Sequence, residues 1–184
     1  QSQSEARASG CVLIGNPDFG EATAGGGDTR NAGWSQLPGT RLELQRIAEV
    51  CKSRQMEARI IEGRQASESA LKLLSGTGTR ILHIATHGFF FPAPTDRSTQ
   101  PSVQMEHTRG RDNFRIERHP LLRSGLILAG ANRAWSGSVA GESAEDGILT
   151  ALEISRLDFS AAELVALSAC ETALGDISTG AGVF

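Results

Sequence analysis

Short apolar runs alternate along this chain with stretches that have helical periodicity. Residues 11–15 (CVLIG) form an apolar run that ends at Asn16 and Pro17, which predicts a buried strand followed by a turn. Thr40 and Glu43 then have the spacing of a capping box, with Thr40 as the N-cap. Apolar residues follow at i, i+3, i+4 and i+7, so we expect a helix that buries Leu44, Ile47, Ala48 and Cys51.

The same alternation continues to the end of the sequence. Strands are predicted at 58–61, 80–85 and 163–168, and 124–129 is a further apolar stretch. Ser67 can cap a second helix that ends at Leu74, and Thr150 with Glu153 repeats the capping box before a third helix. The stretches 20–39, 92–118 and 137–146 are polar and aperiodic. The longest of these, 92–118, is expected to be a poorly ordered or surface excursion.

Strands that alternate with helices predict an α/β fold, in which a mostly parallel central sheet has helices on both faces. Such sheets place their chemistry at the carboxyl ends of the strands. His87 is expected just after the strand at 80–85, and Cys170 just beyond the strand at 163–168. If these strands are neighbours, both residues emerge at one rim of the sheet, as a nucleophile and its general base require.

Composition and charge narrow the possible functions. The 184 residues suit one domain, spanning 1–184, and a net charge of −3 without a basic stretch argues against a nucleic-acid partner. No apolar run approaches the roughly 18 residues that a membrane span needs. Three widely spaced cysteines with no C-x-x-C pair indicate a reducing, cytoplasmic setting rather than a disulfide framework. The scattered histidines and the lack of a carboxylate cluster at ligand spacing predict no metal site.

Four sequence blocks resemble the CHAT family of caspase-like cysteine peptidases. The blocks are HIATHG at 83–88, PLLRSGL at 120–126, DGILTA at 146–151 and LSACET at 167–172, and NPDF at 16–19 with LPGT at 37–40 resembles the opening of the family pattern. The resemblance implies a caspase-haemoglobinase-like three-layer sandwich and a cysteine endopeptidase. In it, His87 is the base and Cys170 the nucleophile. It also implies backbone N–H groups of Gly88 and Cys170 as oxyanion donors, and no cofactor.

The resemblance also implies partners. These are a protein or peptide substrate, an activator protein, and TPR repeats in the same protein, with no nucleic acid or membrane contacted. The family pattern continues past Phe184, so we expect the resemblance to cover the amino-terminal larger part of the domain. We also expect the working enzyme to carry further strands, in sequence or on a second fragment. Two alternatives stay open, namely a non-catalytic CHAT scaffold that binds partners, and an unrelated doubly wound hydrolase or ligand-binding domain.

Several candidate residues also have purely structural interpretations. Gly88 either supplies an oxyanion donor or relieves a tight turn at the end of a strand. Asp146 either faces the substrate or, with Gly147, orders the loop before the third helix. Cys11 and Cys51 fall at apolar positions and are expected in the core, and His83 is expected to pack or hydrogen-bond locally. His107 and His119 lie in or beside the polar excursion and are not expected to be catalytic.

Overall fold

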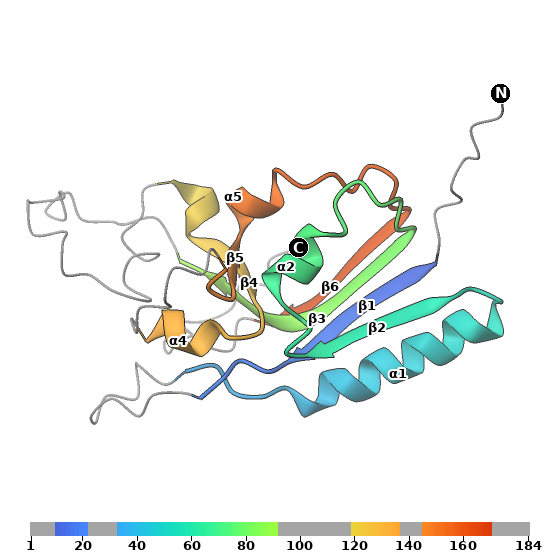
Figure 1. The fold of residues 1–184 in the computed structure, drawn as a ribbon, viewed down its shortest axis with the longest axis horizontal. Coiled ribbons are helices and arrows are strands. Elements are labelled where there is room, and N and C mark those ends of the chain that lie inside the picture. The colour runs from blue at the N-terminus through green and yellow to red at the C-terminus, as the bar shows by residue number, and fades with distance from the viewer. Residues whose placement is uncertain (1–9, 22–32, 92–118, 137–144, 171–184) are drawn as a thin grey trace, which may run out of the picture.

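The computed structural model describes residues 10–21, 33–91, 119–136 and 145–170, except for the side chain of Cys170 (Figure 1). Its strands are β1 (Cys11–Pro17), β2 (Ala58–Gly63), β3 (Ile81–Phe90), β4 (Ser124–Ile127), β5 (Ile148–Thr150) and β6 (Leu164–Cys170). Its helices are α1 (Pro38–Ser53), α2 (Glu68–Lys72), α4 (Ala131–Trp135) and α5 (Ala151–Ile154), with a 3₁₀ turn η3 (Pro120–Leu122). The predictions for 92–118 and 137–144 and for the chain beyond Cys170 lie outside the described residues.

The six strands form one mixed sheet that branches at β3. Strands β2, β1, β3, β4 and β5 lie in that order, and β6 pairs with β3. β1 runs parallel to β2 and β3, and β6 runs parallel to β3, whereas β4 pairs antiparallel with both β3 and β5. The α/β prediction is therefore confirmed, with a mixed sheet. The caspase-haemoglobinase-like sandwich with a mostly parallel sheet stays a prediction.

Strand β3 is longer than the sequence pattern predicted. Its first half, through Ala85, lies between β1 and β6, and from His87 to Phe90 it pairs with β4. Both β4 and β6 pair with His87, so they lie on opposite edges of β3. The expectation that His87 and Gly88 follow the strand is therefore wrong. β4 supplies backbone partners where β1 ends, and this keeps the chain extended.

Helices pack against both faces of the sheet (Figure 1). On one face α1 buries Leu44 and Cys51 against Cys11, Leu13 and Ala85, which confirms the predicted apolar stripe. On the other face a larger cluster joins the sheet to α2 and α5. This cluster includes Val12, Ile14, Ile61, Leu71, Leu82, Ile84, Leu126 and Leu149, with Ile154 packed against it.

The helix starts agree only partly with the sequence prediction. Thr150 does form a capping box with Glu153 at the start of α5. Ser67 caps α2 by accepting a hydrogen bond from the Ala70 N–H, although α2 ends at Lys72 rather than at Leu74. The predicted N-cap role of Thr40 is wrong. Pro38, which has a helix-compatible φ and no N–H to satisfy, is the first residue of α1, so the N-cap is Leu37, three residues before Thr40.

Strand β6 forms an edge in the described part of the chain. Leu164, Val165 and Leu167 are 53%, 46% and 60% exposed, and β3 is the strand that pairs with β6. An edge with apolar side chains on both faces is a surface that proteins normally cover. Among the described residues, no helix is long and apolar enough to cross a membrane.

Leu44→Ala tests the packing of α1 against the sheet. Leu44 is fully buried, so its truncation should cost about 2–5 kcal/mol of unfolding free energy, measured by urea denaturation. Leu42, on the same helix, is 50% exposed, and Leu42→Ala should change stability by less than about 0.5 kcal/mol. Equal losses for the two variants would contradict this packing.

Candidate active site

The backbone register places the two predicted catalytic residues side by side. β3 and β6 run parallel, and His87 is the Cα partner of Cys170, the last residue of β6. Adjacent strands lie about 4.8 Å apart, and register partners belong to the same face of a sheet. Cys170 therefore ends its strand rather than following it, and it lies directly beside His87 in the backbone. The side-chain geometry of the pair stays a prediction.

His87 is buried in an aromatic setting and held by a backbone carbonyl. It is 3% exposed, with ring centroids 5.3 Å from Phe19 and 5.0 Å from Trp34. Its Nε2 lies 2.9 Å from the Ser35 carbonyl oxygen, and because a carbonyl can only accept, Nε2 carries the proton. Burial lowers the pKa of His87, and the bond to Ser35 opposes the shift only in part. The imidazole is therefore neutral at pH 7, with the lone pair on Nδ1.

Asn132 fixes the segment that carries Trp34 and Ser35, and the sequence patterns did not single it out. Asn132 is 1% exposed at the start of α4. Its Oδ1 accepts from the Trp34 N–H at 2.6 Å, and its Nδ2 donates to the Trp34 carbonyl at 3.1 Å and the Gly20 carbonyl at 2.8 Å. One buried amide thus holds two loops around His87. Only a contact between residues 98 positions apart reveals this role.

Gly88 lies in regular strand, so the expectation of a strand-end turn is wrong. It pairs with Leu126, and a Cβ there would meet Ala169 Cβ at 3.5 Å and the Gly125 carbonyl oxygen at 3.6 Å, which are ordinary contacts. Further along the strand, the Phe91 N–H donates to the Arg123 carbonyl at 2.8 Å. Hydrogen-bonded and non-bonded pairs alternate in antiparallel ladders, so the Gly88 N–H points away from β4 and towards the end of β6.

The Cys170 N–H is directed differently. Leu164 N–H donates to the Arg80 carbonyl at 3.2 Å, and the alternation of the parallel ladder then directs the Cys170 N–H at the Thr86 carbonyl. By the same alternation the Gly88 N–H is directed at the Cys170 carbonyl, so both predicted oxyanion donors belong to the last rung between β3 and β6.

Asp146 orders the segment that leads into β5. Its Oδ1 accepts from the Ile148 N–H at 2.8 Å, and the neighbouring Gly147 N–H donates to the buried Glu68 carboxylate at 2.6 Å. Burial raises the pKa of Asp146 to about 6; the Ile148 bond works against this rise, and the Glu68 and Glu153 charges add to it. The loop-ordering interpretation is thus observed, and contact with a substrate stays a prediction.

A charged cluster that the sequence did not reveal supports this segment. Lys72 on α2 lies 2.9 Å from Glu68, 3.3 Å from Glu145 and 3.0 Å from Glu153. Burial acts to lower the pKa of Lys72, but the bonds to Glu68 and Glu153 outweigh it and raise the pKa. One ammonium group therefore ties α2, the Asp146 segment and α5 together.

The other cysteines and histidines have structural roles. Cys11 and Cys51 are buried, as predicted, and burial together with the neighbouring Cys51 raises the pKa of Cys11 to about 12. His83 Nε2 lies 2.9 Å from Glu43 on α1, and His119 caps η3. His107 lies outside the described residues. Within the described ranges, no group of three or more His, Cys, Asp or Glu side chains is arranged to hold a metal ion.

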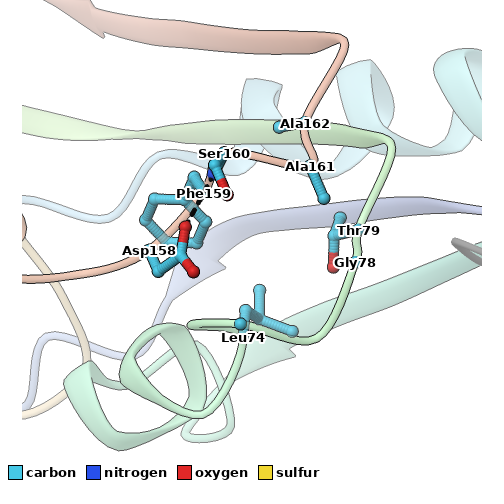
Figure 2. A pocket seen from close by; sticks show the side chains of 9 residues that line it. Leu74, Gly78, Thr79, Asp158, Phe159, Ser160, Ala161 and Ala162 are labelled. Carbon is cyan, nitrogen blue, oxygen red and sulfur yellow. Dashed lines mark hydrogen bonds between the residues drawn. The ribbon is translucent and has the colours of Figure 1, made fainter.

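A pocket of about 140 Å³ lies at the opposite end of the sheet (Figure 2). Leu74 after α2 lines it, together with Gly76, Gly78 and Thr79 before β3 and residues 158–162 before β6. β3 and β6 run parallel, and His87 and Cys170 lie towards the carboxyl ends of these strands. This pocket is therefore separate from the candidate catalytic pair.

The fold defines an α/β protein whose parallel strands β3 and β6 place a histidine beside a cysteine. The CHAT domain family matches residues 1–184, and the chain belongs to that family. CHAT domains are related to caspase-like cysteine peptidases. The chain matches no curated protein and no solved structure at a significant level.

Asn132→Ala tests the support of the His87 surroundings. Removal of the amide leaves the Trp34 N–H and two carbonyls without partners, which should cost about 2–4 kcal/mol of unfolding free energy. The ¹⁵N signals of the His87 ring should also shift, because Ser35 is no longer held in place. Arg133→Ala, an exposed site on the same helix, should alter neither quantity. An unchanged His87 spectrum in Asn132→Ala would refute the link.

Asp146→Asn tests the raised carboxyl pKa. In the folded chain the Asp146 carboxyl group keeps its proton up to about pH 6, whereas an unfolded Asp loses it near pH 4. The stability of the fold therefore falls as pH rises between these two values, and it stays lower above them. The amide oxygen of the variant can still accept from Ile148. Asp146→Asn should therefore melt higher at pH 7.5, by about 1 kcal/mol or 2–4 °C, and the difference should vanish near pH 4.

Asp158→Asn serves as the control of opposite sign. The hydrogen bonds from Ser160 lower the pKa of Asp158, so its contribution is present above the unfolded pKa and is lost as pH falls. Asp158→Asn should therefore lower the melting temperature at pH 7.5. A drop of the same sign in Asp146→Asn would contradict the raised pKa.

Proposed function

We propose that this CHAT domain is a cysteine endopeptidase with His87 as general base and Cys170 as nucleophile. The observation that supports it most is the in-register pairing of these two residues on β3 and β6. Protein or peptide substrates, and an activator or TPR repeats elsewhere in the protein, belong to the same proposal. It requires no cofactor.

The chemistry begins with a neutral imidazole. The Ser35 carbonyl holds the Nε2 proton, so Nδ1 is the atom that takes the proton of the Cys170 thiol. The thiolate attacks the scissile carbonyl carbon, and the imidazolium then protonates the leaving amine as the C–N bond breaks. Water, deprotonated by Nδ1, hydrolyses the thioester and releases the acid and the free thiol.

The negative charge of the tetrahedral intermediate needs N–H donors. The Gly88 and Cys170 N–H groups are the candidates, and the ladder directs both into the last rung between β3 and β6. For either N–H to take part, this rung has to open when substrate binds. We infer that such opening at the end of an edge strand is part of substrate binding.

Peptide-library cleavage tests this function. Cys170→Ala should abolish cleavage, and His87→Gln should lower kcat/KM by about 10²–10⁴, because the base is lost. Since burial lowers the pKa of His87, the base should stay active below the pH of about 6.5 at which free imidazole becomes protonated. No cleavage by the unsubstituted protein, or full cleavage by Cys170→Ala, would contradict the proposal.

Alkylation separates the peptidase from a non-catalytic scaffold without any substrate. Iodoacetamide should modify Cys170 at least tenfold faster than Cys11, whose thiol is buried and has a pKa of about 12. The labelling rate of Cys170 should fall in His87→Gln, while that of Cys11 stays low. A Cys170 labelling rate that is the same with and without His87 would favour the scaffold.

A further inference from the structure

Arg123 is a buried cation without a carboxylate partner in the described part of the chain. It follows η3 and is 6% exposed. Its Nη1 donates to the Phe91 carbonyl at 3.2 Å, and its Nε is enclosed without a hydrogen-bond partner. A buried guanidinium is stable only when its N–H groups and its charge are compensated, and the described residues do not supply a full set of acceptors.

The unused part of the guanidinium is the edge that binds carboxylates. Because Nη1 donates to the Phe91 carbonyl, the remaining edge of the guanidinium is the one formed by Nε and Nη2. Elsewhere in this chain Arg80 uses that same edge on Glu163, with Nε to Oε1 at 2.9 Å and Nη2 to Oε2 at 2.7 Å. Two parallel N–H donors match a planar carboxylate in both spacing and charge.

Arg123 lies on the face of the sheet that carries His87. The register of β3 and β4 pairs His87 with Ile127, and its continuation pairs Phe91 with Arg123, so these residues lie in rows on one face. His87 and Phe91 are four residues apart, or roughly 13 Å along the strand. An extended peptide alongside β3 covers this distance in about four residues.

An aromatic cluster connects the two positions. Its members are Phe19, Trp34, Phe89, Phe91, Ile127, Ala131, Trp135 and Ile148. Trp34 lies 5.0 Å from His87 and 4.8 Å from Trp135, which stacks on Phe91 at 6.2 Å. Trp34 Nε1 is also buried without a partner, so the two unpaired buried side-chain donors of the described residues both adjoin this cluster. An apolar wall with unpaired donors suits an anionic group, because low polarity strengthens a charged hydrogen bond.

We propose that Arg123 binds the carboxylate of an acidic side chain near the cleavage point of the protein substrate. This inference rests on the proposed peptidase function. Arg123 acts in it as a specificity residue, with Nε and Nη2 donating to the two carboxylate oxygens while Nη1 stays on Phe91.

Binding to an inactive chain tests this inference separately from cleavage. The full chain carrying Cys170→Ala is titrated with capped hexapeptide pools that have Glu fixed at one position, beside pools with Gln there. Trp34 and Trp135, the two tryptophans of the chain, report binding by fluorescence. We expect a Glu pool to bind at least about tenfold more tightly than its Gln counterpart, as a charged bidentate pair provides.

Substitutions at Arg123 test whether this residue causes the preference for Glu pools. In Arg123→Gln the Glu-to-Gln ratio should fall to near one, whereas Arg123→Lys, which keeps the charge without the planar fork, should retain part of it. Arg133→Gln, an exposed arginine on the helix that carries Trp135, should keep the full ratio. If Arg123→Gln does not fold, as judged by its melting curve, Arg123→Lys provides the comparison.

Several results would overturn the inference. One is equal binding of all Glu and Gln pools, and the other is a Glu preference that survives in the folded Arg123 variants. Pools with phosphoserine at the fixed position provide a further comparison. If they bind more tightly than the Glu pools, and Arg123→Gln removes this difference, the ligand of Arg123 is a phosphate and the carboxylate proposal fails. If the protein cleaves peptides without any preference for acidic residues, the role of Arg123 is rejected and the peptidase function stands. If the protein cleaves nothing but binds Glu pools through Arg123, the peptidase function is rejected.

Discussion

The pairing of β3 with three different strands is the constraint on which the rest of the structure depends. Through Ala85 its backbone is bonded to β1 on one edge and β6 on the other, and from His87 onward β4 takes the edge that β1 leaves. Ten residues therefore stay extended through the point where a parallel α/β strand would usually end in a loop. This extension fixes the register of His87 against Cys170 and aligns Phe89 and Phe91 behind it.

Buried polar groups then decide how the loops meet this strand. Asn132 satisfies the backbone on both sides of Trp34, and the Ser35 carbonyl fixes the proton on His87 Nε2. On the opposite face Lys72 and the buried Glu68 hold the Asp146 segment. Because an unpaired buried polar group is costly, each contact restricts its loop to essentially one position. The candidate site is thus assembled from several segments, and no single stretch of sequence contains it.

Arg123 and the exposed side of β6 differ from this pattern, since their contacts are incomplete among the described residues. The guanidinium has one backbone acceptor, and Leu164 and Leu167 are more than half exposed on an edge strand. Incomplete polar and apolar contacts on one fold usually mark surfaces where something binds. Here they adjoin the two strands that carry the candidate catalytic pair.

The sequence by itself determined the elements whose signals are local. Apolar runs predicted β1, β2 and β6, the spacing of Leu44 and Cys51 predicted the buried face of α1, and Thr150 with Glu153 predicted the start of α5. The motifs around His87 and Cys170 also gave the family correctly. Only the tertiary structure decided that β3 runs on through Gly88, that the sheet is mixed, and that Asn132, Lys72 and Arg123 matter. These outcomes depend on partners far along the chain, such as Ile127 for His87, and the free energy of such contacts has no counterpart in a local sequence pattern.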